Sequence, residues 1–349
     1  MAIIITKQSK GYLFTGALAI AVVLFVLGLN YYNRMYCANV DLEKAKLLFI
    51  PTGSDFNTVV DSVKKNNLVI NIESFIKASN TLGYTNKVKP GCYKIKPSMS
   101  NRSIIRMLIS AMQSPVKVTF NNVRTFEQLA GKISNQLESD SLSIIRLFRE
   151  VESAEYYGFN DKTFISMFIP NTYEFYWNTD AKSFFDRMKR EYEKFWNKER
   201  DEKAKVLGLK RDEISTMASI IEEETNKHDE RSRIAGVYIN RLKKHMPLQA
   251  DPTIKFALGD FSIKRILTKQ LEVKSPYNTY KNIGLPPGPI CCPSTSSIDA
   301  TLNFENHQYL YFCAKEDFSG YHVFAKTLAE HNRNADAYRK ALNRERIYR

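Results

Sequence analysis

The sequence is poor in the residues on which disulfide scaffolds and metal centres depend. Its 349 residues include only five cysteines and five histidines. The cysteines are odd in number and lack the paired spacing of a zinc site or a disulfide framework. The histidines form no His-Glu-x-x-His pattern or other paired ligand spacing. We therefore do not expect metal catalysis, and we predict no bound metal and no cofactor.

The sequence also lacks the signatures of nucleic-acid and nucleotide binding. It contains no zinc finger, no aromatic ribonucleoprotein strand motif and no Gly-rich phosphate loop. Its formal net charge of +14 is spread along the chain. Such a charge favours general attraction to an anionic surface or polymer, such as lipid headgroups or an acidic cell wall. The length and a hydrophobic fraction of 44% predict folded protein of two or three domains.

Charged residues are absent from one long segment near the N-terminus. Residues 11–32 carry no charge and are densely apolar, and about 20 such residues cross a bilayer as a helix. Lys7 and Lys10 precede the segment, so we predict a cytoplasmic tail over residues 1–10 and export of everything after the helix. A cleaved signal peptide is the alternative, although no small-x-small cleavage site lies between Leu27 and Asn33.

The chain after this segment divides into three predicted regions. Residues 40–115 alternate short strand patterns with amphipathic helix patterns, which predicts a small α/β module that serves either for binding or as a spacer. Residues 116–210 read as a charged helical linking region with an aromatic-rich break at residues 168–175. Residues 211–345 hold the densest motifs. The fold class is therefore α+β, with a transmembrane helix, a small α/β module and a mixed α+β catalytic domain.

One carboxylate stands out in the helix predicted to begin near Glu213. At 100° per residue, Met217, Ile221 and Glu224 fall on one stripe, whereas Glu222 and Glu223 point away from it. Burial on an apolar face raises the pKa of a carboxyl group and keeps it protonated, as a general acid requires. A structural role for a buried Glu is the alternative.

Three segments downstream add polar and aromatic groups. Asp251 stands before Pro252 and is expected to cap a helix, which leaves Gln249 freer to reach a ligand. The loop at residues 275–280 displays aromatic rings beside amides, the groups that a pyranose ring requires. A predicted hairpin at residues 309–324 carries His322. The predicted substrate contacts are Gln249, Tyr277, Asn278, Thr279, Tyr280, Glu174 and His322.

Several of these segments match one family in order and spacing. They are Ala218-Ser219-Ile220-Ile221-Glu222-Glu223-Glu224-Thr225, Ile239-Asn240-Arg241-Leu242, Leu248-Gln249-Ala250-Asp251-Pro252-Thr253, Ser275-Pro276-Tyr277-Asn278-Thr279-Tyr280 and Gly284-Leu285-Pro286-Pro287-Gly288-Pro289-Ile290. The chain resembles the MltG (YceG-like) endolytic murein transglycosylases over residues 168–338, and more weakly over residues 116–166. The predicted anchor also fits this family, as does a LysM-like module over residues 40–115 with its Gly91-Cys92-Tyr93 strand.

The resemblance implies a lyase that cleaves peptidoglycan glycan strands without water. Its catalytic acid falls on Glu224, which would protonate the glycosidic oxygen and then act as base while a 1,6-anhydro-muramyl end forms. The implied partners are glycan strands and penicillin-binding peptidoglycan synthases, and the implied location is the cytoplasmic membrane with the catalytic region outside. Two alternatives remain: a muramidase that pairs Glu224 with Asp251 or Glu174, and a non-catalytic peptidoglycan-binding scaffold.

Overall fold

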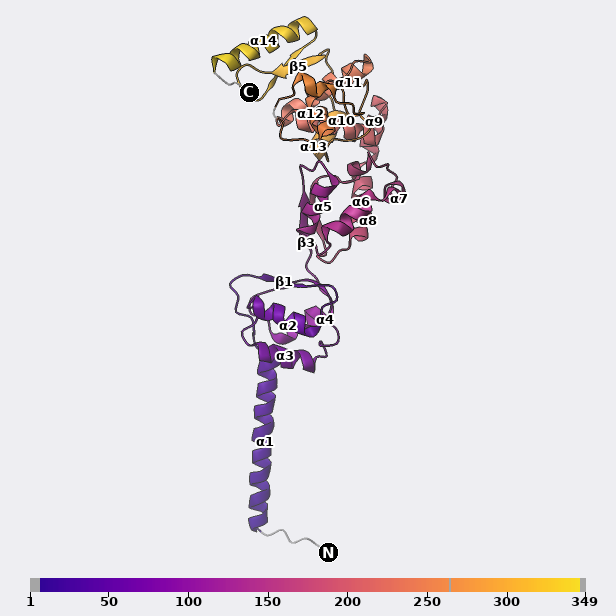
Figure 1. The fold of residues 1–349 in the computed structure, drawn as a ribbon. Helices are drawn as coiled ribbons and strands as arrows, with labels where there is room; N and C mark the ends of the chain where they lie inside the picture. The colour runs from indigo at the N-terminus through magenta and orange to yellow at the C-terminus, as the bar shows by residue number, and fades with distance from the viewer. Residues whose placement is uncertain (1–6, 264, 346–349) are drawn as a thin grey trace. The chain divides into compact units, whose positions relative to one another are not determined.

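The computed structural model describes residues 7–263 and 265–345, with side chains from residue 14 onward, and shows a mixed α+β protein (Figure 1). The backbone divides into two compact units. Unit 1 comprises Met1–Lys117 and Glu174–Thr179, and unit 2 comprises Val118–Tyr173 and Asp180–Arg349. The predicted α+β class is confirmed. The LysM-like character of residues 40–115 and the predicted five-part division of the chain stay predictions.

The first described element is a long apolar helix, α1 (Lys7–Tyr36). Its segment Phe14–Tyr36 has a mean hydropathy of 2.1, and it is the one helix in the described part of the chain that is long and apolar enough to cross a membrane. Large apolar side chains along it, such as Phe14 and Phe25, are exposed to their surroundings. Residues 1–6 of the predicted cytoplasmic tail lie outside the described residues.

The rest of unit 1 is a small α/β fold. Its elements are β1 (Lys46–Ile50), α2 (Phe56–Lys65), α3 (Ile72–Thr81), β2 (Gly91–Ile95) and α4 (Asn101–Ile109). β1 and β2 pair antiparallel, with Leu48 opposite Tyr93. Asp55, Asn71 and Ser100 each accept a backbone N–H bond at the start of a helix, which is the usual reason for helices to begin at such residues.

Unit 2 opens with a helical region around an aromatic core. The elements of this region are β3 (Val116–Phe120), α5 (Phe126–Ser134), α6 (Ser141–Arg149), α7 (Val151–Tyr156), η1 (Phe164–Met167), β4 (Asn171–Phe175), α8 (Ala181–Phe195) and α9 (Lys198–Leu207). The first two residues of β3 and the last two of β4 are assigned to unit 1. β3 pairs with β4 across a sequence gap of some fifty residues. The rings of Phe148, Phe164 and Phe185 pack with centroids between 4.7 and 5.9 Å apart. Such contacts bury large apolar area and hold the helices together.

The remainder of unit 2 carries the motifs. Its elements are α10 (Arg211–Glu224), η2 (His228–Glu230), α11 (Arg231–Lys243), α12 (Asp251–Leu258), η3 (Thr268–Glu272), α13 (Thr295–Leu302), β5 (Tyr311–Ala314), β6 (His322–Ala325) and α14 (Leu328–Arg344). β5 and β6 form the predicted antiparallel hairpin. Met217, Ile221, Ile234 and Tyr238 join α10 and α11 in one apolar core.

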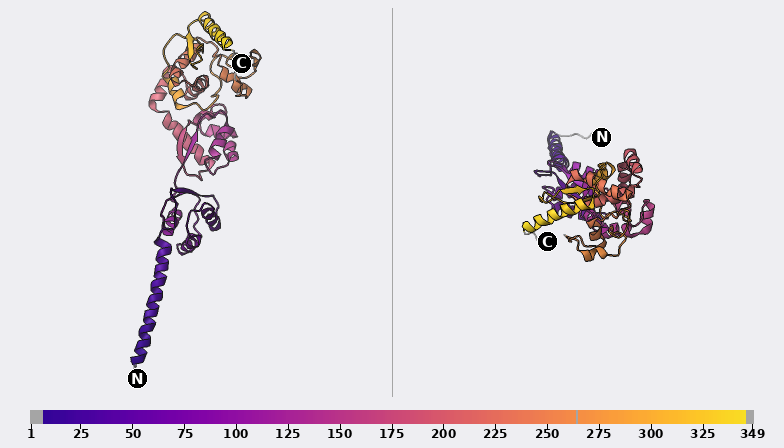
Figure 2. Two further views of the ribbon diagram at one scale, coloured as in Figure 1. Left: turned by 90° about the vertical axis from the view of Figure 1, so that its left-hand side faces the viewer. Right: turned by 90° about the horizontal axis from the view of Figure 1, so that it is seen from above.

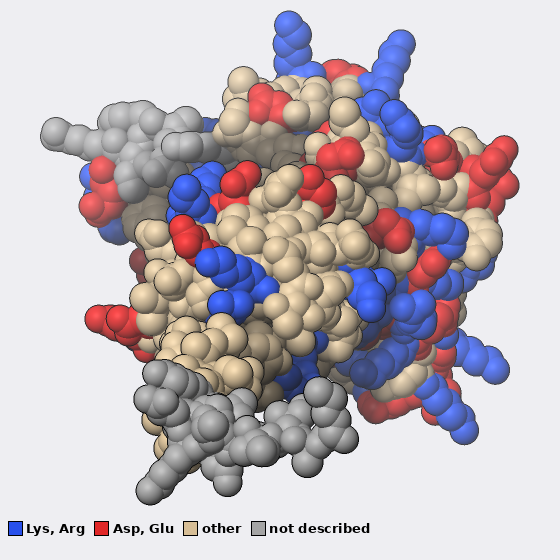
Figure 3. All heavy atoms as spheres, turned by 90° about the horizontal axis from the view of Figure 1, so that it is seen from below, with Lys and Arg blue, Asp and Glu red and all other residues tan. Residues whose placement is uncertain are grey.

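The charge pattern on the surface agrees with the sequence. Over the face drawn in Figure 3, Lys and Arg side chains are interspersed with Asp and Glu and do not merge into one basic patch. A surface of this kind attracts polyanions in general and does not concentrate the positive charge at one binding site.

Candidate active site

The C-terminal end of α10 brings Glu224 out of the core. Met217, Ile220 and Ile221 on the same face are fully buried, as their helical spacing predicts. Glu224 is the last residue of the helix, and Thr225 continues in extended conformation. Its side chain therefore leaves the apolar core at the helix end and is only partly exposed.

Glu224 faces a cavity of about 360 Å³ in unit 2. The cavity is lined by Glu224, Tyr238, Arg241, Leu248, Gln249, Asp251, Tyr280, Tyr311, Phe312, Leu328 and His331. These residues come from α10, α11, α12, β5, α14 and two loops, so separate parts of the sequence meet there. Aromatic rings, an amide and two carboxylates on one cavity wall suit a polar ring-shaped ligand.

The surroundings of Glu224 raise its pKa to about 7, chiefly because burial disfavours the charged form. The Tyr238 hydroxyl donates a 2.6 Å hydrogen bond to Glu224 Oε1 and opposes this rise, whereas the Asp251 charge adds to it. Lys255 and Arg241 lower the pKa to a smaller extent. Glu224 is therefore partly protonated near neutrality and able both to donate and to accept a proton.

Arg241 braces the cavity wall beside Glu224. Its guanidinium donates to the backbone oxygens of Leu310 at 2.6 Å and of Leu248 at 2.9 Å, and to Gln249 Oε1 at 3.2 Å. These bonds join the loop before α12 to the start of the β5–β6 hairpin. A planar group with five donors suits this bridging role.

Asp251 does not have the predicted capping role. It is the first residue of α12, the N-cap position falls on Ala250, and no side chain caps that helix end. Asp251 instead accepts a 2.5 Å hydrogen bond from the Tyr280 hydroxyl and lines the cavity with Glu224. Pro252 follows at the start of the helix, as expected. The capping prediction is wrong because a tertiary partner competes successfully with the local cap.

The loop at residues 275–280 contributes one side chain to the cavity, that of Tyr280. Tyr277 packs on Phe256 with ring centroids 4.6 Å apart. Asn278 is fully buried, and its amide donates to the backbone oxygens of Leu271 and Val273 at 2.8 Å. Thr279 Oγ1 accepts from the Ala250 N–H at 3.0 Å. These three residues shape the loop, and their predicted substrate contacts stay predictions.

Of the other predicted contacts, Gln249 lies on the cavity wall, and its backbone N–H donates to the Thr279 oxygen at 3.0 Å. Glu174 is exposed on β4 and belongs to unit 1. His322 has its Nδ1 3.0 Å from Glu230 Oε2 and anchors β6 to the start of α11. Neither Glu174 nor His322 is among the described residues that line the cavity.

Several cavity residues were missed by the sequence predictions. Tyr238 and Arg241 stand three apart on α11, a spacing that places them on one helix face and that could have suggested them. His331 stacks on Tyr311 with ring centroids 5.5 Å apart, and its Nδ1 is buried with no hydrogen-bond partner among the described residues. Burial lowers the pKa of His331 and so favours its neutral ring.

The two carboxylates beside Glu224 are engaged elsewhere. Arg124 donates to both oxygens of Glu223 at 3.0 and 2.8 Å. Glu222 Oε2 accepts from the Ser294 hydroxyl at 2.5 Å and lies 3.4 Å from Arg231 Nη1. Of the three consecutive glutamates, Glu224 therefore remains for chemistry in the cavity.

The Gly/Pro loop at residues 284–290 supports α10 from behind. The Ile290 N–H donates to Ser219 Oγ at 3.0 Å. A Cβ atom on Gly288 would lie 2.2 Å from the Lys162 backbone oxygen, so only glycine fits there. The loop thus helps to set the position of the helix that presents Glu224.

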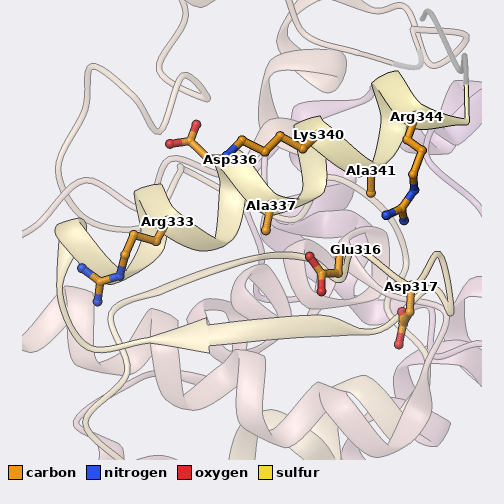
Figure 4. A pocket seen from close by; sticks show the side chains of 8 residues that line it. All are labelled: Glu316, Asp317, Arg333, Asp336, Ala337, Lys340, Ala341 and Arg344. Atoms are coloured by element: carbon orange, nitrogen blue, oxygen red, sulfur yellow. The ribbon is translucent and has the colours of Figure 1, made fainter.

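Other features of the described chain show no comparable arrangement. A larger cavity of about 830 Å³ lies between α14 and the β5–β6 turn, where Glu316 and Asp317 face a row that includes Ala337, Ala341 and Arg344 (Figure 4). Its acidic and basic residues balance, and no predicted site residue lines it. Among the described residues, no cluster of three or more His, Cys, Asp or Glu is placed to hold a metal ion.

Comparison with known proteins decides the family. The family model described as YceG-like matches residues 48–337, which is most of the chain. The chain belongs to the YceG-like family. The sequence-based recognition of this family is confirmed.

Curated relatives share one enzyme name. An endolytic murein transglycosylase of Bacillus subtilis is 33% identical over 84% of this chain and 85% of its own length. One from Streptococcus pneumoniae is 29% identical over 82% of this chain, which spans 57% of that relative. A crystal structure of a putative yceG-like protein from Listeria monocytogenes is 29% identical, has a TM-score of 0.56, and covers 84% of this chain and 99% of its own. The prediction of an enzyme of the lytic transglycosylase class is thereby confirmed.

Proposed function

We propose that this protein is an endolytic peptidoglycan lytic transglycosylase that cleaves the MurNAc–GlcNAc bond and leaves 1,6-anhydro-MurNAc ends. The observation that carries the proposal is the placement of Glu224, whose pKa is raised to about 7 at a cavity lined by aromatic and amide groups. Family membership and the name shared by the curated relatives support the same reaction.

A single carboxyl group suffices for this reaction. Protonated Glu224 gives its proton to the glycosidic oxygen, the C1–O bond breaks, and the GlcNAc fragment leaves with a free hydroxyl. The ionised Glu224 then takes the proton of the muramyl C6 hydroxyl while that oxygen bonds to C1 and closes the anhydro ring. Glu224 ends protonated as it began and no water is consumed. A pKa near 7 suits a group that must act in both directions.

The cavity residues supply the binding that the reaction needs. The Tyr238 hydroxyl holds Glu224 Oε1 while Glu224 lines the cavity. Gln249 offers an amide, and Tyr280 and Tyr311 offer ring faces and hydroxyls. Of the predicted substrate contacts, we retain Gln249 and Tyr280 as direct ones, and we add His331.

Hydrolysis is the second candidate, because Asp251 shares the cavity with Glu224. Two carboxylates on either side of a sugar ring are the usual equipment of a glycoside hydrolase, in which one protonates and the other activates water. The position of Asp251 in the cavity therefore supports a muramidase that pairs Glu224 with Asp251. A muramidase that pairs Glu224 with Glu174 gains no such support. In the structure the Tyr280 hydroxyl engages Asp251 Oδ1, which leaves one oxygen of this carboxylate for a water.

The products of cleavage distinguish the candidates. Incubated with uncrosslinked glycan strands, the purified full chain should release internal fragments whose muramyl ends are one water lighter than reducing ends, measured by mass spectrometry. Asp251→Asn should give the same anhydro ends. Reducing ends from the wild type that disappear in Asp251→Asn would establish the hydrolase. Retention on insoluble wall without any cleavage would establish the scaffold.

Replacing Tyr238 with Phe should change the pH dependence of the reaction in a defined direction. The Tyr238 hydrogen bond favours the charged form of Glu224 and lowers its pKa, so its loss should raise this pKa above about 7. The alkaline limb of kcat/KM should then move to higher pH, which a pH–rate profile of both proteins would show. A profile that moves to lower pH, or does not move, would contradict the proposed partnership.

We propose a single-pass membrane location, with the N-terminus in the cytoplasm and the catalytic region outside it. The length and composition of Phe14–Tyr36 support a membrane span, and the lysines before it support this orientation. A LysM-like role of residues 40–115 in binding nascent strands, and contact with penicillin-binding synthases, belong to the same proposal.

A further inference from the structure

The helix that is apolar enough to span a membrane does not end in a linker. The candidate span runs from Phe14 to Tyr36, yet Met35 is fully buried and belongs to the hydrophobic core of unit 1. Its neighbours in this core include Phe75 of α3 and Ile104 of α4. The last turn of α1 is therefore part of the folded module.

A buried polar network closes the same junction. The fully buried Asn101 donates from Nδ2 to the Arg34 backbone oxygen at 2.9 Å and to Ser74 Oγ at 3.0 Å. Asn39 donates to Asn101 Oδ1 at 2.7 Å and exchanges two further bonds with the Asn71 backbone. These bonds satisfy a carbonyl at the end of α1 and tie it to the starts of α3 and α4. Buried networks of this kind resist local bending.

The residues around this junction are typical of a membrane–water boundary. Tyr32 and Tyr36 stack with centroids 5.4 Å apart, and the Arg102 guanidinium lies 5.1 Å above the Tyr36 ring. Tyr side chains concentrate at both membrane–water interfaces. Long Arg side chains near the end of a membrane helix extend to the headgroup level. Since about 20 residues cross the hydrocarbon region, a span that begins near Phe14 reaches this level near Arg34.

One exposed apolar side chain stands beside the helix end. Ile70 has 66% of its surface exposed, and its N–H donates to the Asn39 oxygen at 2.8 Å. It immediately precedes Asn71, which caps α3. Within unit 1, α3 lies next to the end of α1 while β1 lies at the opposite side, in both side views (Figures 1 and 2). An exposed Ile at the level of the end of α1 would lie in the interface between lipid and water.

We propose that unit 1 is docked rigidly on the outer bilayer surface through an anchor collar formed by Arg34, Tyr36, Ile70 and Arg102. The collar's two guanidinium groups contact anionic lipid headgroups, and Ile70 enters the interface. The continuous α1 helix holds the collar at that depth. This inference rests on the proposed membrane span and is independent of the catalytic reaction.

Depth-dependent fluorescence quenching tests the docking in the full chain. With Cys37 and Cys313 changed to Ser, the remaining native cysteines, Cys92, Cys291 and Cys292, are buried. A cysteine introduced at Ile70 or at Leu47 would then be the exposed thiol that carries an NBD fluorophore. Leu47 is the matched control, because it is also an exposed apolar residue of unit 1 but lies on β1. In vesicles of phosphatidylcholine and phosphatidylglycerol with nitroxide-labelled lipid, the label at residue 70 should be quenched and that at residue 47 should not. Equal quenching at both positions, or none at residue 70, would overturn the proposal.

Two further variants separate the rigid connection from the charges. A flexible insertion of about ten residues between Asn33 and Arg34 leaves Met35 in the core and should abolish quenching at residue 70. Quenching that persists would overturn the role given to the continuous helix. In the intact chain, Arg102→Gln should weaken the anionic-lipid contact, measured as quenching of the label at residue 70, by about fivefold, since each basic residue near such a surface contributes about that factor. Lys94→Gln on β2 removes the same charge away from the collar and should have no effect; an equal loss for both would contradict a specific collar.

Discussion

Replacement of Glu224 by Gln should lower the rate of glycan cleavage by at least about 10²–10⁴-fold, the usual contribution of one general acid–base group. The substitution keeps the shape and the Tyr238 contact but removes the transferable proton. The loss should lie at the top of that range or beyond it, because the same group would act in both steps. The measurement is kcat on uncrosslinked strands, with product ends counted by mass spectrometry.

The matched control is the neighbouring carboxylate. Glu223→Gln removes one charge from the same helix turn but acts on the Arg124 ion pair, which is partly exposed and lies outside the cavity. It should leave kcat within a few-fold of the wild type. If Glu223→Gln abolished cleavage while Glu224→Gln retained it, the assignment of the acid would be wrong.

A stability measurement distinguishes lost chemistry from lost folding. The pKa of Glu224 is raised from 4.5 to about 7 in the folded chain, so the wild type loses stability as pH rises through that window. Glu224→Gln escapes this loss and should be more stable than the wild type by about 3 kcal/mol at pH 8, because a rise of about 2.5 pKa units corresponds to that energy at 1.36 kcal/mol per unit. The difference should vanish at pH 4. An inactive variant that is also more stable at pH 8 has lost a catalytic group.

Helical periodicity explains why Glu224 could be predicted from the sequence. The apolar stripe of α10 extends over two turns, and a carboxylate that continues it must lie at the edge of the core. The pairing of Tyr238 with Glu224 could not be derived in this way, because it depends on how α10 and α11 pack. The same holds for His331, which reaches the cavity from α14, more than one hundred residues along the chain.

A helix-capping rule based on neighbouring residues failed where the side chain bonds to a residue far away in the sequence. Asp before Pro predicts a cap, but the Tyr280 hydroxyl draws Asp251 into the cavity. In the loop at residues 275–280, Asn278 and Thr279 form hydrogen bonds with backbone groups, and their predicted ligand contacts stay predictions. The strands and helices of unit 1 could be predicted from the spacing of their apolar residues. The pairing of β3 with β4 could not, because it depends on contacts between residues far apart in the sequence.

The second large effect is expected in stability and concerns Glu222. Arg231 is only 4% exposed, and its Nη1 lies 3.4 Å from Glu222 Oε2. The same carboxylate accepts from the hydroxyls of Ser294 and Ser297 at the start of α13. Glu222→Ala would leave the guanidinium buried without its counter-charge, which typically costs about 3–5 kcal/mol. Chemical denaturation at pH 7 should show that loss as a lower midpoint with an unchanged slope.

A double variant shows whether the unpaired charge causes the loss. If it does, Arg231→Met should offset part of the effect of Glu222→Ala, because replacing both members of a buried ion pair is often close to neutral. Simple addition of the two single effects would instead mean that the serine hydrogen bonds of Glu222 hold α10 to α13. Glu223→Ala, whose partner Arg124 is 32% exposed, should cost only about 1 kcal/mol. Three consecutive glutamates would then differ by partner alone: Glu222 stabilises the core, Glu223 forms a surface-proximal ion pair, and Glu224 is left with the proton that the reaction needs.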